Sequence, residues 1–105
     1  MDRKLPKTFV EFRDRFPAIE EAHSQAAKAV EQAGPLGDKE MALVKIGICA
    51  GAGLESALRS HVRRALEAGV SGEEIEQAVL LSLNTVGFPM TVAAWQWARQ
   101  EMAKA

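Results

Sequence analysis

Apolar side chains recur along most of the chain with the 3.6-residue period of an α-helix. Helices are predicted on this basis over residues 6–15, 17–33, 41–51, 54–68, 71–86 and 89–105. No segment shows the two-residue alternation that is typical of a half-buried strand. The pattern therefore predicts an all-α fold of five or six helices.

Turn and capping residues mark the ends of these helices. Proline suits a first helical turn and glycine suits the position after the last turn, and such residues stand at Pro17, Gly34, Gly87 and Pro89. Ser71 and Glu74 have the S-x-x-E spacing of a capping box, in which each side chain accepts a hydrogen bond from the other residue's backbone N–H. We expect the helix that follows Ser71 to end near Gly87.

The segment MALVKIGICAGAG, residues 41–53, is apolar on every side. Its only charged residue is Lys45. A helix that is apolar all round must be buried all round, and a small domain offers few neighbouring helices to cover it. We therefore expect other copies of the chain to cover part of this helix. The alternative is a central core helix in a monomer.

Composition narrows the class of protein. The 105 residues fit one domain, 1–105. Thirteen basic and fourteen acidic side chains leave no positive excess for binding nucleic acid. A single cysteine excludes an internal disulfide and a cysteine-rich zinc site, and is usual in a reducing compartment. No stretch is apolar enough for a leader or a membrane span, so we expect a cytoplasmic protein that does not enter a membrane.

His61 lies on the apolar side of the predicted helix 54–68, together with Leu58 and Val62. Most buried polar groups are hydrogen-bonded within the fold. The spacing by itself therefore favours an imidazole that packs and bonds to a carbonyl. A catalytic imidazole is the alternative, and it would titrate near neutral pH.

Residues 41–51 and 54–68 are predicted to form an antiparallel helical hairpin that turns near Gly51–Gly53. The facing pairs would then be Ala42 with His61, Lys45 with Leu58, and Cys49 with Leu54. One pocket would hold His61, Lys45 and Cys49. A partly buried lysine binds an anion or acts as a base, and it lowers the pKa of a nearby thiol. Alternatively, Lys45 extends to solvent and Cys49 is a small core residue.

The segments PLGDKEMALVKIG, SHVRRALEAGVSGEEIEQAVL and NTVGFPMTVAAWQWA together resemble the carboxymuconolactone decarboxylase family, which includes the alkyl hydroperoxidase D proteins. The most specific element is the histidine at a fixed distance before a glycine and a capping box. The resemblance covers roughly residues 17–102. It implies an all-helical fold that forms trimers or hexamers, with active sites bounded by the two central helices and often a neighbouring subunit.

The chain departs from the peroxidase branch of that family. That branch has a glutamate on the first central helix and a C-x-x-C-x-x-x-H motif on the second, and only the histidine, His61, is present here. Ala42 stands at the glutamate position, and Leu54 and Ala57 stand at the cysteine positions. A dithiol cycle needs two thiols. The decarboxylase branch also lacks the pair and keeps the histidine, so the chain is closer to it.

Three functions remain, and we favour the first. It is a lyase that decarboxylates a small carboxylated lactone or related acid in a homohexamer or homotrimer, with His61 in proton transfer and Lys45 or Arg64 holding the carboxylate. The second is a single-cysteine peroxidase using Cys49, and the third is a noncatalytic oligomer. We expect neither a metal ion nor a cofactor. The predicted catalytic residues are His61, Lys45 and Cys49, and the predicted substrate contacts are Ala42, Leu54, Ala57, Leu58 and Arg64.

Overall fold

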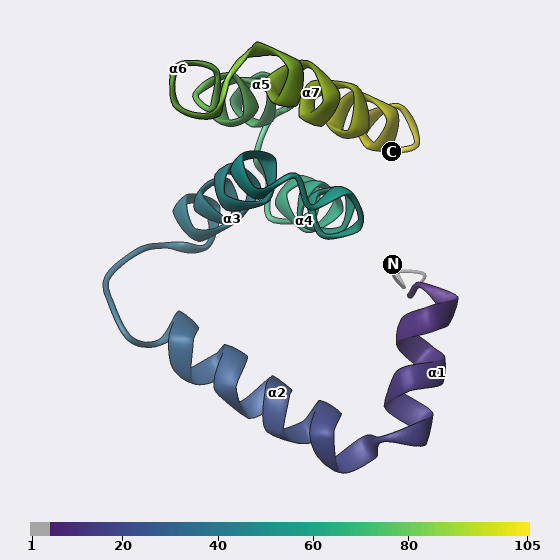
Figure 1. Cartoon of the computed structure of the whole chain (residues 1–105). Coiled ribbons are helices and arrows are strands. Elements are labelled where there is room, and N and C mark those ends of the chain that lie inside the picture. The colour runs from purple at the N-terminus through teal and green to yellow at the C-terminus, as the bar shows by residue number, and fades with distance from the viewer. Residues whose placement is uncertain (1–4) are drawn as a thin grey trace. The chain divides into compact units, whose positions relative to one another are not determined.

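A computed structural model describes residues 5–105, and within this range the chain is all-α, as expected (Figure 1). Its helices are α1 (Lys7–Arg15), α2 (Pro17–Glu31), α3 (Asp38–Ala52), α4 (Glu55–Glu67), α5 (Gly72–Leu80), α6 (Leu83–Val86) and α7 (Phe88–Ala103). The chain divides into two units, one ending at Pro35 and one spanning Leu36–Ala105. The single domain 1–105, whose first four residues lie outside the described range, stays a prediction.

The second unit contains the hydrophobic core, which α3, α4, α5 and α7 form together. Its fully buried side chains include Ile46 from α3, Leu58 and Val62 from α4, and Ile75 and Val79 from α5. From α7, Ala94 and Ala98 complete this core. Small residues on α7 bring its backbone close to the other helices, so that a 70-residue segment can close a core around α3 and α4.

The connection between α3 and α4 is short and depends on one glycine. Gly53 adopts a left-handed conformation with a φ of 67°, in which a side chain is disfavoured and glycine is not. The backbone N–H of Leu54 donates to the carbonyl oxygen of Cys49 at 3.0 Å, and α4 begins one residue later. The predicted helical hairpin and its turn are therefore confirmed.

The capping box at the start of α5 is also confirmed. The backbone N–H of Glu74 donates to the Ser71 hydroxyl oxygen at 3.1 Å. In return, the backbone N–H of Ser71 donates to a Glu74 carboxylate oxygen at 2.8 Å. Two N–H groups that the helix leaves unpaired at its first turn are thus satisfied.

The single helix expected from Ser71 to Gly87 is divided in the structure. It ends at Leu80, and the short α6 follows after Ser82. The Ser82 hydroxyl donates to the carbonyl oxygen of Val79 at 2.7 Å and lies 2.8 Å from the Thr91 hydroxyl on α7. A serine that bonds to nearby backbone competes with the helical hydrogen-bond pattern, and this local bonding accompanies the break.

The α3 helix is buried on one side only. Ile46, Cys49 and Ala50 lie in the core, whereas Val44 is 50% exposed and Ile48 is 59% exposed. The second unit by itself therefore covers the apolar surface of α3 incompletely. Its burial by other copies stays a prediction.

The first unit has no buried residue in α1 or α2, although the two helices contact each other. The apolar side chains of Ile19 and Val30 on α2 are both exposed. Phe12 and Phe16 are exposed as well, with their ring centroids 5.2 Å apart. The first unit by itself therefore does not bury these apolar side chains.

A buried carboxylate joins α4 to α7. Glu101 is only 3% exposed, and its oxygens accept hydrogen bonds from Arg63 at 3.0 Å and Arg59 at 3.4 Å, as well as from Lys104 at 3.1 Å. Burial by itself would raise the pKa of Glu101, but the hydrogen bonds from Arg63 and Lys104 outweigh it and lower that pKa. Arg59 and Arg63 are therefore engaged in holding the fold together.

Candidate functional site

His61 lies at the border of the core. It belongs to α4 and is half-buried, between the fully buried Leu58 and Val62. The interpretation as a packing residue requires a hydrogen bond from the imidazole to a carbonyl. The structure shows no hydrogen bond to this imidazole from any residue in the range 5–105. Its ring nitrogens are therefore left for water or a ligand.

Two cations influence His61. The pKa of the imidazole is lowered, first by burial and then by the positive charges of Arg64 on α4 and Lys45 on α3. Lys45 and Arg64 are thus near enough to His61 to act on it electrostatically, as the hairpin predicted for Lys45. A lowered pKa keeps the imidazole neutral at pH 7, so it can accept a proton. The two cations favour a bound anion at the same place.

Cys49 has a different environment from the one expected of a reactive thiol. Its side chain belongs to the hydrophobic core and is buried. Burial raises the pKa of this thiol, whereas the predicted effect of Lys45 was to lower it. A raised pKa reduces the fraction of nucleophilic thiolate. The catalytic role of Cys49 stays a prediction, and its burial counts against it.

The predicted substrate contacts are placed unevenly. Leu58 is fully buried in the core, so the structure offers no support for its contact with a substrate. Ala42 and Ala57 are partly buried and pack against that core. Leu54 and Arg64 are exposed. Among the predicted site residues, the structure connects Lys45 and Arg64 to His61 through the effect of their positive charges on its pKa.

The Arg64 guanidinium is free to bind an anion. Its neighbours Arg59 and Arg63 bond to Glu101, while Arg64 has no carboxylate partner among residues 5–105. The same residues contain no group of three or more His, Cys, Asp or Glu side chains that could hold a metal ion. The groups that the structure places at this site are the His61 imidazole and the positive charges of Arg64 and Lys45 that act on it.

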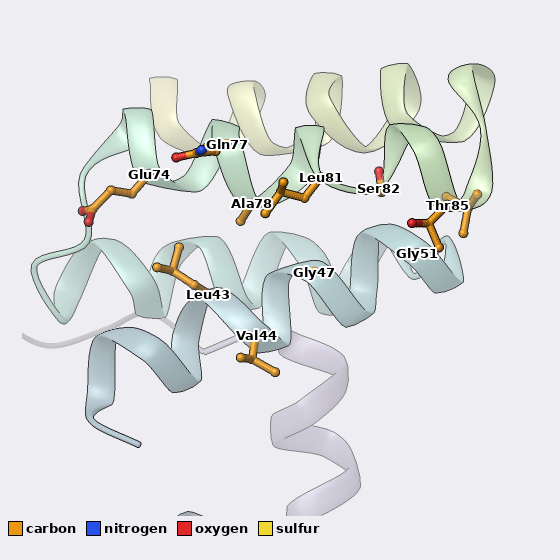
Figure 2. Close-up of a pocket in the computed structure, with 11 residues that line it drawn as sticks. Leu43, Val44, Gly47, Gly51, Glu74, Gln77, Ala78, Leu81, Ser82 and Thr85 are labelled. Atoms are coloured by element: carbon orange, nitrogen blue, oxygen red, sulfur yellow. The ribbon is translucent and has the colours of Figure 1, made fainter. Parts of the chain in front are cut away.

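A cavity of about 500 Å³ lies elsewhere in the second unit, between α3 and the segment formed by α5 and α6 (Figure 2). Its lining residues are Leu43, Val44, Gly47, Gly51, Glu74, Gln77, Ala78, Leu81, Ser82, Thr85 and Val86. None of the predicted site residues is among them. The sequence signal that indicates it is Gly47 and Gly51, two glycines four residues apart within an apolar helix.

In this part of the chain, residues 5–105, no helix has both the length and the apolar character needed to cross a membrane.

The chain thus combines a helical hairpin, a histidine on the second helix of that hairpin and a capping box after it. The model of the Carboxymuconolactone decarboxylase family matches residues 17–100. The chain belongs to this family, and the predicted resemblance is confirmed. With one cysteine it has no C-x-x-C pair. Comparison with curated proteins and with solved structures gives no match.

Proposed function

We propose that the protein is a lyase that decarboxylates a small carboxylated lactone or a related acid. The observation that supports this most directly is the half-buried, unbonded imidazole of His61 within electrostatic reach of Lys45 and Arg64. Family membership is consistent with the activity but fixes neither substrate nor reaction, because one fold supports different chemistries.

The proposed reaction needs one proton. The bond between the substrate carbon and its carboxylate breaks, carbon dioxide leaves, and the electron pair stays on carbon, which then takes a proton. The negative substrate offsets the positive charges that lower the pKa of His61, so the imidazole takes up a proton from water when the substrate binds. His61 then donates this proton to carbon and returns to its neutral form.

Arg64 has the role of binding the carboxylate. It is exposed, has no carboxylate partner in residues 5–105, and its planar guanidinium can bind a carboxylate through two hydrogen bonds. Lys45 contributes positive charge from α3. Positive charge also stabilises the negative charge that develops on carbon as carbon dioxide leaves.

The proposal extends to the place and form in which the protein acts. We expect a homohexamer or homotrimer, because Val44 and Ile48 expose an apolar side of α3. A reducing compartment such as the cytoplasm suits a protein whose single cysteine is a buried, free thiol.

The test is carbon dioxide release from a panel of small carboxylated lactones by the parent protein and three variants. His61→Asn should lower kcat by about 10²- to 10⁴-fold, because it removes the proton donor. Arg64→Gln should mainly raise KM. Arg99→Gln is its matched control, because Arg99 is also an exposed arginine and its guanidinium lies 4.7 Å from the centroid of the Trp95 ring.

Two results would reject the proposal. Unchanged carbon dioxide release in His61→Leu would show that the imidazole only fills space. Rapid thiol-dependent peroxide turnover that Cys49→Ser abolishes would favour the redox function instead. Full decarboxylation by a Cys49→Ser variant would show that, of His61 and Cys49, only His61 is essential for the reaction.

A further inference from the structure

The cavity between α3 and the α5–α6 segment is separate from the His61 site. It lies on the side of α3 that faces α5, whereas His61 comes from α4. In Figure 2, Leu43 points from α3 toward α5, and Ala78 of α5 and Leu81, the residue after α5, point toward α3. Apolar side chains therefore form most of its surface. A volume of about 500 Å³ falls within the range of pockets that bind small molecules.

Two glycines open this cavity at the backbone of α3. Glycine inside a helix costs about 0.5–1 kcal/mol of stability relative to alanine. A Cβ atom on Gly47 would meet nothing within 4 Å, and one on Gly51 would meet only Val86 Cγ1, at 3.9 Å. The packing of the described chain therefore requires glycine at neither position. A molecule that lies directly against the α3 backbone would require it at both.

The polar groups of the cavity suit a neutral ligand. The side chains of Gln77 and Thr85 make no hydrogen bond to other residues in the range 5–105. The Thr85 hydroxyl is turned toward the middle of the cavity in Figure 2. Both groups can donate and accept. The Ser82 hydroxyl, in contrast, is engaged with Val79 and Thr91.

The charge in the lining of the cavity disfavours anions. Among residues 5–105, Glu74 is the only ionisable residue in its lining. The pKa of Glu74 is lowered because its carboxylate accepts a hydrogen bond from the Ser71 backbone, so it is negative at neutral pH. A carboxylate ligand would be repelled here, whereas the cations around His61 would attract it.

We propose that this cavity is a second binding site, which takes a neutral small molecule with an apolar body and a hydroxyl or amide group. The apolar body lies against Leu43, Gly47 and Leu81. The polar group bonds to Thr85 or Gln77. The site is independent of the proposed decarboxylation, since the two sites share no residue, and one takes a neutral ligand whereas the other takes an anion.

The test is a calorimetric titration of the parent protein with 1-octanol, followed by competition with octanoate, which has the same chain length and a negative charge. Saturable binding of 1-octanol is expected, and octanoate should not displace it. Gly47→Leu, which fills the cavity, should weaken binding of 1-octanol at least about tenfold. Gly34→Leu is the matched control, because its Cβ also meets nothing within 4 Å and it lies outside the cavity.

Thr85→Val tests the polar end without filling the cavity. The loss of one hydrogen bond should weaken 1-octanol binding about fivefold, and this variant serves if Gly47→Leu does not fold. Unchanged affinity in both variants would overturn the proposal, as would displacement of 1-octanol by octanoate at similar affinity. The proposal would also be overturned if 1-octanol showed no saturable binding. A lower oligomeric mass for Gly47→Leu would then identify the cavity as a contact between copies.

Discussion

His61 is a base whose protonation depends on its neighbours. Burial, Arg64 and Lys45 all disfavour the imidazolium form. We therefore predict a pKa below the unperturbed value of about 6.5 in the free protein, and a rise when a small carboxylate binds between the cations. NMR titration of the imidazole protons measures both. The protein has two histidines, His23 and His61, and His61→Asn identifies the signal.

The same shift predicts how His61 affects stability with pH. Because its pKa is lower in the folded chain, the unfolded chain binds the proton more readily. The free energy of unfolding should therefore decrease as the pH falls through about 6.5 toward the folded pKa. Urea unfolding of the parent and of His61→Asn should diverge over this interval. A pKa above 6.5 that no carboxylate changes would contradict the electrostatic interpretation.

Glu101 gives a dependence of the same sign at lower pH. Its pKa is lowered, because hydrogen bonds from Arg63 and Lys104 outweigh burial, so its contribution is complete above about pH 4.3 and is lost as the pH falls through the folded pKa. Glu101→Gln should lower the free energy of unfolding by about 2 kcal/mol at pH 7, the scale of hydrogen bonds to charged groups. Glu73→Gln, at an exposed position, is the control. Equal stability of both variants at pH 7 would contradict this role.

At the scale of helices, the α3–α4 connection should depend on the conformation of one residue. Gly53→Ala places a Cβ in a left-handed conformation and 3.0 Å from the Met90 Cε atom. A destabilisation of about 1–2 kcal/mol is expected, which is the cost of that conformation for a residue with a side chain. Gly34→Ala should be nearly neutral, because it meets neither condition. Thermal unfolding of the two variants measures the difference, and equal melting temperatures would refute it.

Helices were predictable wherever the signal was local. The Ser71 and Glu74 pattern predicts the start of α5 directly, because each side chain accepts a hydrogen bond from the backbone N–H of the other residue. The break after Leu80 could not be predicted in this way. It accompanies the contact between Ser82 and Thr91, which lies on another helix, and a contact between helices leaves no periodic pattern in the sequence.

The candidate site was predictable in part for the same reason. The hairpin spacing indicated that Lys45 lies near His61, and the pKa of His61 responds to it. The same spacing predicts Cys49 in this pocket, but burial raises the pKa of its thiol, and the extent of burial depends on how several helices pack. The burial of Glu101 could not be predicted from the sequence, because its arginine partners on α4 lie about 40 residues away along the chain.

Each of the two units, taken by itself, exposes large apolar side chains. In the second unit, the large apolar side chains that are exposed and do not line the cavity include Ile48, Leu80, Leu83, Phe88 and Val92. In the first unit, α1 and α2 contain no buried residue. Soluble monomers rarely expose large contiguous apolar patches. These surfaces therefore favour contacts between copies of the chain.

We predict that light scattering at micromolar concentration gives three or six times the mass of one chain. Ile48→Glu should lower this mass while the helical circular dichroism persists, because Ile48 is 59% exposed and lies outside the chain's own core. A charge buried at an interface without a partner is costly. Gln96→Glu, which adds the same charge at an exposed position of α7, should leave the mass unchanged. A parent protein with the mass of one chain would refute the assembly and would leave the exposed side of α3 to be explained by another partner.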